Sequence, residues 1–296
     1  MSISESQLET WSHLGQTGQF PATYQTIKAV LDDSRAPYAN RQADSFLQGS
    51  YKNETNVHGR DSDVDIVLRT RAVYYSDTDH LKPDEKAKFE KNWSAATYDL
   101  SHFKTEVVTW LQKHYGDAVV VGPKAITIAG NGSRRDADVL VCAEFHRYYS
   151  FENEYNPNKV EGICFFLPDT TRVENFPEQH HDNCTSKHKN TNRLFKPTVR
   201  VYKNLRNKLI EDGRLADDVA ASYFIEGMLY NAPPDRFGGT HQANFLDTLN
   251  WICQADRGKF ECANEAFYLL HDYSPVTWTA AKCNTFLNAA VKYWDE

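Results

Sequence analysis

Two aspartates, Asp63 and Asp65, stand two residues apart in a segment, residues 62–69, in which three consecutive apolar side chains at 66–68 follow them. The alternation at its start predicts a β-strand. Side chains two apart on a strand share one face, and neighbouring carboxylates repel each other unless a cation joins them. Magnesium suits such a pair, because it prefers oxygen ligands and shares its shell with substrate phosphates. The alternative interpretation is a solvated acidic turn that leads into an edge strand.

Gly49 and Ser50 lie upstream of this pair, with Ser50 thirteen residues before Asp63. A short strand around residues 46–48 should run into them. Glycine lets the backbone approach a phosphate closely, and Ser50 offers a hydroxyl and an amide to the β- and γ-phosphates in a backbone nest. This spacing favours nucleotide chemistry over a bare acidic turn.

A third carboxylate could come from Asp136 or from Asp138. We favour Asp138, because it precedes an apolar run much as Asp65 does, which would place it on a neighbouring strand. Three carboxylates can hold two metal ions about 3.5–4 Å apart. Phosphoryl transfer needs mainly such positioning and charge neutralisation, so the sequence predicts metal-dependent transfer of a nucleotide.

A basic segment follows at residues 187–214, with nine lysines and arginines against two acidic residues. Arg200, Lys203 and Asn207 have the spacing of one helix face. A triphosphate needs such a positive surface. We expect most of the nine charges to be solvated. Lys203, and after it Arg200, are the candidates for a phosphate contact, and the choice of Lys203 rests on the family resemblance described below.

The composition limits the class of protein. The 296 residues carry a net charge of -7, and the six cysteines include no CxxC pair. A binder of long nucleic acids is usually basic, reduced scattered cysteines are typical of the cytoplasm, and no apolar run is long enough to cross a membrane. We therefore expect a cytoplasmic protein, a monomer, with neither a long nucleic-acid partner nor a membrane partner.

The order of elements predicts an α+β fold. The first 46 residues read as helical, with Pro21 and Thr23 at a helix start. A long helix is expected over 83–115, and then strands over 118–121, 125–129 and 137–143 and a hairpin over 160–173. The expected helices near the C-terminus are 196–211, 216–231, 241–255, 259–271 and 276–294. We predict a mixed-sheet core at 1–180 and a helical lobe at 181–296, with the active site in the cleft between them.

The chain resembles the polymerase-β-like nucleotidyltransferases in its Gly49-Ser50 and Asp63-Val64-Asp65 motifs. It is more narrowly similar to the bacterial CD-NTases of CBASS anti-phage systems, which are relatives of cyclic GMP–AMP synthase. The resemblance covers most of the chain and includes these further segments: Tyr24–Lys28, Leu47–Tyr51, Thr55–Asn56, Ala137–Val141, Asn175–His180, Lys196–Lys203 and Ser222–Phe224.

This resemblance implies an enzyme that joins NTPs into a cyclic di- or trinucleotide second messenger, releases pyrophosphate and acts on a separate effector through its product. It implies two Mg²⁺ ions, or Mn²⁺, held by Asp63, Asp65 and Asp138. It also implies triphosphate contacts at Gly49, Ser50, Lys203 and Ser222, and stacking of Tyr223 on the donor base. Tyr223 could instead be a core aromatic.

Several alternatives stay open at this stage. His180, His181, Cys184 and His188 have plausible zinc spacing but lack a second thiol; a loop near the substrate, with Asn175 or His180 against a base, is the simpler interpretation. The acceptor could be an antibiotic or a tRNA, or the chain could be an inactive nucleotide-binding regulator. Residue types alone do not specify the bases, the linkage, the ring size, the activating signal or the effector.

Overall fold

The protein is described by a computed structural model that covers residues 3–15, 18–57, 63–94, 96–272 and 274–296. The chain forms two compact units. We call Gly18–Gln48 with Asp63–Phe176 the sheet unit, and Met1–Thr17, Gly49–Ser62 and Pro177–Glu296 the helical unit. The last crossing between units, at Pro177, lies near the expected division at residue 180. The first helix and Gly49-Ser50, however, group with the C-terminal helices.

The sheet unit is built on a mixed sheet, in which seven strands are described. The strand order is β1-β2-β5-β4-β3, with β6 paired to β5 and β7 paired to β6. Only β2 and β5 are parallel among the described pairs. The strands are β1 Ala43–Leu47, β2 Val64–Asp77, β3 Val119–Val121, β4 Ile126–Ile128, β5 Ala137–Phe151, β6 Pro157–Phe166 and β7 Arg172–Asn175. The predicted α+β class and the strand assignments near 63–69, 119–128 and 137–143 are confirmed.

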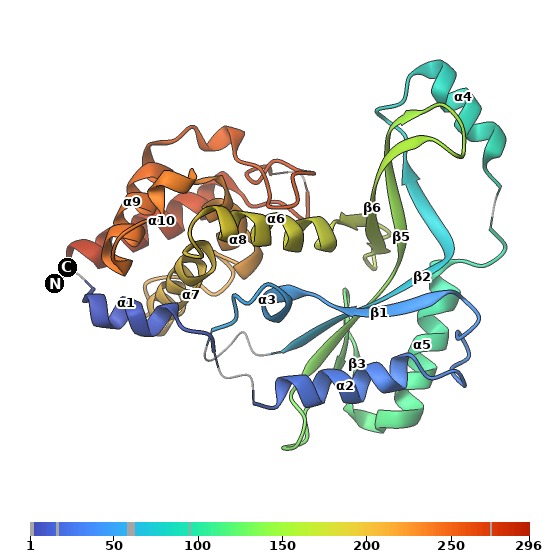
Figure 1. Ribbon diagram of the computed structural model, residues 1–296. Helices are drawn as coiled ribbons and strands as arrows, with labels where there is room; N and C mark the ends of the chain where they lie inside the picture. The colour runs from blue at the N-terminus through green and yellow to red at the C-terminus, as the bar shows by residue number, and fades with distance from the viewer. Residues whose placement is uncertain (1–2, 16–17, 58–62, 95, 273) are drawn as a thin grey trace. The chain divides into compact units, whose positions relative to one another are not determined.

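Two helices cover the first half of β2. The helices α2 (Phe20–Leu31) and α5 (Leu100–Tyr115) pack against each other and against β2, as Figure 1 shows. Pro21 lies in the first turn of α2, as predicted, where its missing N–H costs nothing. The indole of Trp110 donates to the carbonyl of Val30 at 2.8 Å and links the two helices.

The single helix expected over 83–115 is wrong, because the chain forms two helices there. The first, α4 (Pro83–Asn92), ends before Trp93, whose side chain is 53% exposed. The carboxylate of Asp99 accepts from the backbone N–H groups of Ser101 and His102 and starts α5 anew. Figure 1 places α4 at the far end of the long strands, where Phe89 packs with Leu81, Tyr148 and Phe151.

The helical unit is arranged around α7 (Phe195–Glu211), which packs against α1, α6, α8, α9 and α10. The other helices are α1 Glu5–Ser12, α3 Gly49–Lys52, α6 Pro177–Asn190, α8 Ser222–Asn231, α9 His241–Gln254 and α10 Ala280–Asp295, and the short 3₁₀ turns of the chain are η1 Gly116–Ala118, η2 Pro234–Arg236 and η3 Arg257–Lys259. None of the described helices combines the length and apolarity that a membrane crossing requires.

Three predictions in this unit are wrong. Residues 259–271 do not form a helix: isolated bridges pair Glu261 with Tyr268 and Leu270 with Trp278. Phe260, Cys262 and Leu269 of this segment are buried, and apolar spacing alone does not distinguish such an irregular buried segment from a helix. The prediction of a loop near His180 is also wrong, because residues 177–190 are helical. In addition, α8 begins at Ser222 and not at residue 216.

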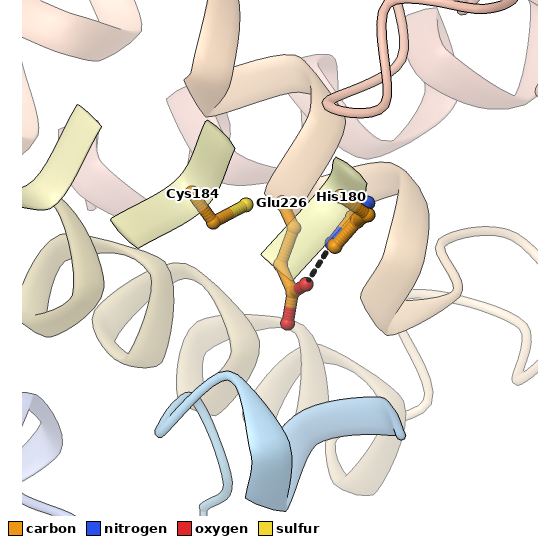
Figure 2. Close-up of side chains that lie close together, drawn as sticks. All are labelled: His180, Cys184 and Glu226. Atoms are coloured by element: carbon orange, nitrogen blue, oxygen red, sulfur yellow. Dashed lines mark hydrogen bonds and ion pairs between the residues drawn. The ribbon is translucent and has the colours of Figure 1, made fainter. Parts of the chain in front are cut away.

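One buried polar contact joins α6 and α8. Figure 2 shows His180 of α6 facing Glu226 of α8, with Cys184 one helical turn further along α6. All three side chains are buried. The helices of this unit thus meet at an ionic contact as well as at apolar side chains.

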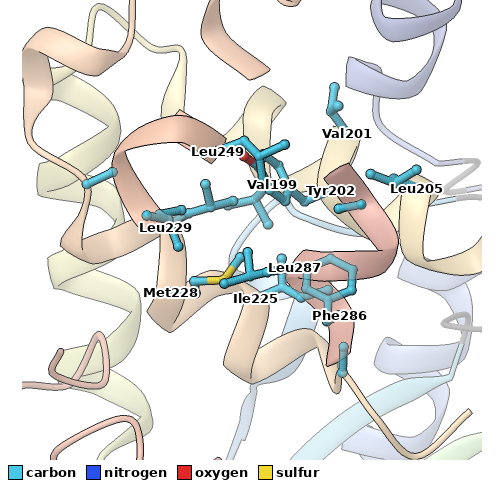
Figure 3. Packing of buried hydrophobic residues seen from close by; sticks show 14 of the residues in the cluster. Val199, Val201, Tyr202, Leu205, Ile225, Met228, Leu229, Leu249, Phe286 and Leu287 are labelled. Atoms are coloured by element: carbon cyan, nitrogen blue, oxygen red, sulfur yellow. The ribbon is translucent and has the colours of Figure 1, made fainter. Parts of the chain in front are cut away.

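The apolar core of the helical unit lies beside this contact. Figure 3 shows side chains from α7, α8 and α10 interdigitating, among them Leu205, Met228 and Phe286. All three are fully buried. Such close packing makes the unit sensitive to lost volume.

We predict that Leu205→Ala destabilises the protein by about 2–5 kcal/mol, because it leaves a cavity in this core. Denaturant unfolding followed by circular dichroism measures the loss. Tyr155→Ala is the matched control, since Tyr155 is 88% exposed. A loss for Leu205→Ala no larger than that of the control would contradict the packing described.

Candidate active site

Asp65 and Asp138 are direct neighbours on the only parallel strand pair described. They occupy the same register position of β2 and β5. Paired residues of parallel strands point to the same face, and adjacent strands lie about 4.8 Å apart. Both side chains are half-buried, whereas Asp63, just before β2, is exposed. The prediction that Asp138 lies on a strand next to that of Asp65 is confirmed.

The structure separates Asp138 from Asp136, the other candidate. Asp136 is exposed, and its Oδ1 accepts from the backbone N–H of Gly130 at 2.6 Å, so it closes the turn between β4 and β5. Oδ1 of Asp138 accepts from the hydroxyl of Thr127 on β4 at 2.7 Å. Thr127 therefore orients the carboxylate that faces Asp65, and Asp136 serves the hairpin.

Gly49 and Ser50 begin the short helix α3 directly after β1, and we call this single helical turn the Gly49-Ser50 turn. The backbone N–H of Gln48 donates to the carbonyl of Asp65 at 3.0 Å, so β1 ends beside Asp65. Gly49 follows with φ +72, the left-handed region that favours glycine. Its carbonyl accepts from the N–H of Asn53 at 3.1 Å, and that of Ser50 accepts from the N–H of Thr55 at 2.9 Å. These bonds hold the Gly49-Ser50 turn, and its role as a phosphate nest stays a prediction.

Glu226 is a buried carboxylate that the sequence analysis missed. Its Oε1 accepts from the hydroxyl of Thr55, and its Oε2 accepts from Asn53 Nδ2 at 3.0 Å and from His180 Nε2 at 2.7 Å. The signal that could have found it is one charged residue inside the apolar run of α8. A charge in such a run requires buried partners.

The partners of Glu226 change its ionisation. Burial alone would raise the pKa of Glu226, but the His180 hydrogen bond and charge, with Lys203 and Thr55, lower it to about 2. Burial alone would lower the pKa of His180, but Cys184 and Glu226 raise it to about 10. We conclude that the His180–Glu226 contact is an ion pair at neutral pH.

Lys203 and Arg200, the two candidates for a phosphate contact, are both buried. Lys203 is fully buried, and its Nζ donates to the carbonyl of Thr55 at 2.9 Å. Arg200 is 8% exposed and donates to the carbonyls of Ser12 and Glu54, each at 2.5 Å. Both side chains tie α7 to the segment that follows Gly49-Ser50.

Five of the nine basic residues are half-buried or exposed, so the expectation that most of these charges are solvated holds for the segment but not for Lys203 and Arg200. Four are buried: Lys196, Arg200, Lys203 and Arg206. Burial is possible because each has backbone carbonyls or polar side chains as partners. Sequence spacing identified the face of the helix but not that the rest of the unit covers it.

Ser222 and Tyr223 open α8. The hydroxyl of Ser222 accepts from Arg206 Nη1 at 3.2 Å. The ring of Tyr223 stacks on His180, with centroids 5.0 Å apart and planes at 22°, and its hydroxyl accepts from Asn264 Nδ2 at 3.1 Å. Tyr223 also packs against the helical core, so at least one face of its ring is occupied by protein.

The four residues with zinc-like spacing, His180, His181, Cys184 and His188, do not come together around one point. His181 Nδ1 donates to Oδ1 of Asn53 at 3.0 Å, and His188 Nδ1 accepts from the N–H of Lys196 at 3.3 Å. Within the described residues, only His180 and Cys184 of the proposed zinc set meet, with Glu226 as a third group. Glu226 already accepts three hydrogen bonds, so its contact with His180 fits an ion pair better than a metal site.

Asn175 is the last residue of β7 in the sheet unit. Its Oδ1 accepts from the backbone N–H of Phe176, the residue between β7 and α6, at 2.8 Å. The side chain is half-buried. This local contact leaves its proposed role at a base untested.

Residues 182–295 match the sequence model of the cGAS/DncV-like nucleotidyltransferase C-terminal helical domain. The chain is 36% identical to a cyclic UMP-AMP synthase of Rhodothermus marinus, and the match covers 99% of this chain and 98% of that protein. The chain belongs to the CD-NTases. A cyclic dipurine nucleotide synthase of Elizabethkingia meningoseptica is 32% identical to this CD-NTase, over 94% of each protein.

Solved structures agree with this membership. The Rhodothermus marinus c-UMP-AMP synthase with Apcpp and Upnpp superimposes with a TM-score of 0.88, at 35% identity, over 99% of this chain and 97% of that one. The Elizabethkingia meningoseptica synthase with GTP and Apcpp gives a TM-score of 0.79 at 31% identity, over 98% of each. The predicted polymerase-β-like fold is confirmed, as is the predicted class of activity, a nucleotidyltransferase that makes cyclic oligonucleotides.

We predict that Glu226→Gln destabilises the protein by about 3–5 kcal/mol near pH 6, because it leaves buried cations without a counter-charge. The raised pKa of His180 stabilises the fold fully below pH 6.5, its ordinary value, and this contribution is lost as the pH rises through about 10. The lowered pKa of Glu226 adds no change above pH 4.5. The difference from wild type should therefore shrink from pH 6 to pH 10.

Denaturant unfolding at several pH values measures this difference, with Lys203 and Cys184 as the other titratable groups near the pair. Tyr202→Phe is the control, because Tyr202 is fully buried in the same unit and its hydroxyl bonds Phe245 and Thr248. A pH-independent difference for Glu226→Gln would mean that His180 is neutral.

Proposed function

We propose that this CD-NTase joins NTPs into a cyclic dinucleotide, or a trinucleotide, in a magnesium-dependent reaction at Asp63, Asp65 and Asp138. The observation that carries the proposal is the register pairing of Asp65 with Asp138. It brings together two carboxylates that are 73 residues apart in the chain. Such a pair is costly without a cation and well suited to one.

The residues present fit magnesium. All three candidate ligands are carboxylates, the donor type that a hard cation prefers. Asp65 and Asp138 are half-buried and Asp63 is exposed, so none is shut away from a phosphate. Thr127 supports Asp138 as an outer partner. When bound, magnesium would neutralise the triphosphate and lower the pKa of the attacking hydroxyl.

The chain's own residues would do the rest. A ribose hydroxyl attacks the α-phosphorus, the bond from that phosphorus to the bridging oxygen breaks, and pyrophosphate leaves. Asp138 would assist removal of the hydroxyl proton. Gly49 and Ser50 would contact the triphosphate. A second transfer of the same kind would close the ring.

The helical unit would supply the other contacts. Ser222 lies at the N-terminus of α8 and would contact the triphosphate, and Tyr223 would offer a ring to the donor base. Because Lys203 and Arg200 bond backbone carbonyls around Thr55 and Glu54, we propose that they serve the triphosphate partly through that segment. Asn175 would contact a base.

In the cell, the product would act as a second messenger in anti-phage signalling. The relatives differ in the product that their names give: cyclic UMP-AMP for one and cyclic dipurine nucleotides for another. An assay should therefore offer all four NTPs. The partner of this chain is the substrate itself, and the effector is reached through the product.

Incubation of the purified protein with all four NTPs and magnesium should give a phosphatase-resistant cyclic product, identified by mass spectrometry. Asp63→Ala combined with Asp65→Ala should abolish that product without unfolding the protein, because the variant lacks two of the three ligands. Undiminished synthesis would contradict the metal assignment. NMP transfer only onto an antibiotic or tRNA would show that the acceptor is different. Tight NTP binding without turnover would show an inactive nucleotide-binding regulator.

Asp138→Ala should lower the rate of synthesis by at least about a hundredfold, the scale of a lost catalytic base or metal ligand. Asp136→Ala is the matched control two residues away, since Asp136 closes the β4–β5 turn. It should retain most of the activity. If the two variants lose activity equally, the effect belongs to the hairpin and Asp138 has no separate role.

A further inference from the structure

The segment after Gly49-Ser50 is polar yet buried. Asn53 is 5% exposed, Thr55 0% and Asn56 2%. Buried polar side chains are rarely left without partners, because an unmade hydrogen bond in the interior is costly. The contacts of this segment therefore indicate what holds it in place.

Its partners come from four separate parts of the helical unit. Glu226 of α8 accepts from the side chains of Asn53 and Thr55. Lys203 and Arg200 of α7 donate to the carbonyls of Thr55 and Glu54. His181 of α6 donates to Asn53, and Gly15, beyond α1, donates to the carbonyl of Asn56 at 3.1 Å.

The segment in turn determines the conformation of Gly49-Ser50. The N–H of Asn53 donates to the carbonyl of Gly49, and the N–H of Thr55 donates to that of Ser50. The anchored residues are therefore the ones that close the Gly49-Ser50 turn. If Thr55 moved, the carbonyl of Ser50 would lose its partner and the turn could open.

We propose that Glu226 is a positioning residue of the nucleotidyl transfer: through Asn53 and Thr55, this buried carboxylate holds the Gly49-Ser50 turn in the conformation that receives a triphosphate. The inference rests on the proposed function, in which Gly49 and Ser50 contact the triphosphate. Glu226 is 3% exposed and acts only through other residues.

The same carboxylate links the turn to Tyr223. His180 donates to Oε2 of Glu226 while its ring stacks on Tyr223, an arrangement that Figure 2 shows in part. Glu226 thus connects a proposed triphosphate contact with a proposed base contact. A change at Glu226 should affect nucleotide binding more than the chemical step.

Thr55→Val tests this with little change of shape. The variant removes the hydroxyl that bonds Glu226 but keeps the carbonyl that Lys203 bonds. We expect KM for the NTPs, and the Kd of a non-hydrolysable ATP analogue with magnesium, to rise about ten- to a hundredfold, the scale of a lost hydrogen bond to a charged group. The value of kcat should change much less.

Three further variants sharpen the test. Thr55→Ser keeps the hydroxyl and should restore KM. Glu226→Gln should raise KM in the same direction, and its combination with Thr55→Val should fall short of the product of the two single effects, because both act on one contact. Tyr202→Phe loses a buried hydrogen bond elsewhere in the unit and should leave KM unchanged.

Hydrogen exchange gives a readout that needs no turnover. The amides of Asn53 and Thr55, which close the turn, should exchange faster in Thr55→Val than in wild type and Tyr202→Phe. Unchanged KM, Kd and exchange in Thr55→Val would overturn the inference, as would a lowered Tm alone. If wild type makes no cyclic product, the proposed function fails, and the analogue's Kd and the exchange rates still decide whether Glu226 positions the turn.

Discussion

Among the described residues of the helical unit, Glu226 is the buried carboxylate around which several separate segments meet. Glu226 lies among three hydrogen-bond donors and two cationic side chains, those of His180 and Lys203. Removing a carboxylate from water is costly, and the cost is offset only if every oxygen has good partners. Those partners belong to α6, α7 and the segment after Gly49-Ser50. The position of each is therefore constrained by the needs of one carboxylate.

The sheet unit has a comparable constraint in the parallel pairing of β2 and β5. That pairing places Asp65 beside Asp138, and parallel neighbours cannot be joined by a short turn. The chain between them supplies α4, α5, β3 and β4. One residue of β4, Thr127, returns to orient Asp138, so the connection contributes to the site as well as to the topology.

Nucleotidyl transfer depends mainly on positioning and charge neutralisation, and in this CD-NTase both constraints fix the positions of polar groups that are distant in the chain. The relatives that match over nearly the whole chain are named for different products. Bases are distinguished by a few hydrogen bonds in a pocket. Similar folds can therefore make different cyclic nucleotides, and base choice must be measured for each member.

The sequence by itself determined the strand that follows Asp63, the neighbouring strand that carries Asp138 and the end of a strand at Gly49-Ser50, because these depend on local periodicity and on the freedom of glycine. Only the tertiary structure decided that Lys203 and Arg200 are buried and that Asp99 divides the helix expected over 83–115. It also revealed Glu226, whose partner Thr55 is 171 residues away in the chain. Periodicity reports backbone geometry, whereas the partner of a buried charge is chosen by contacts between distant segments.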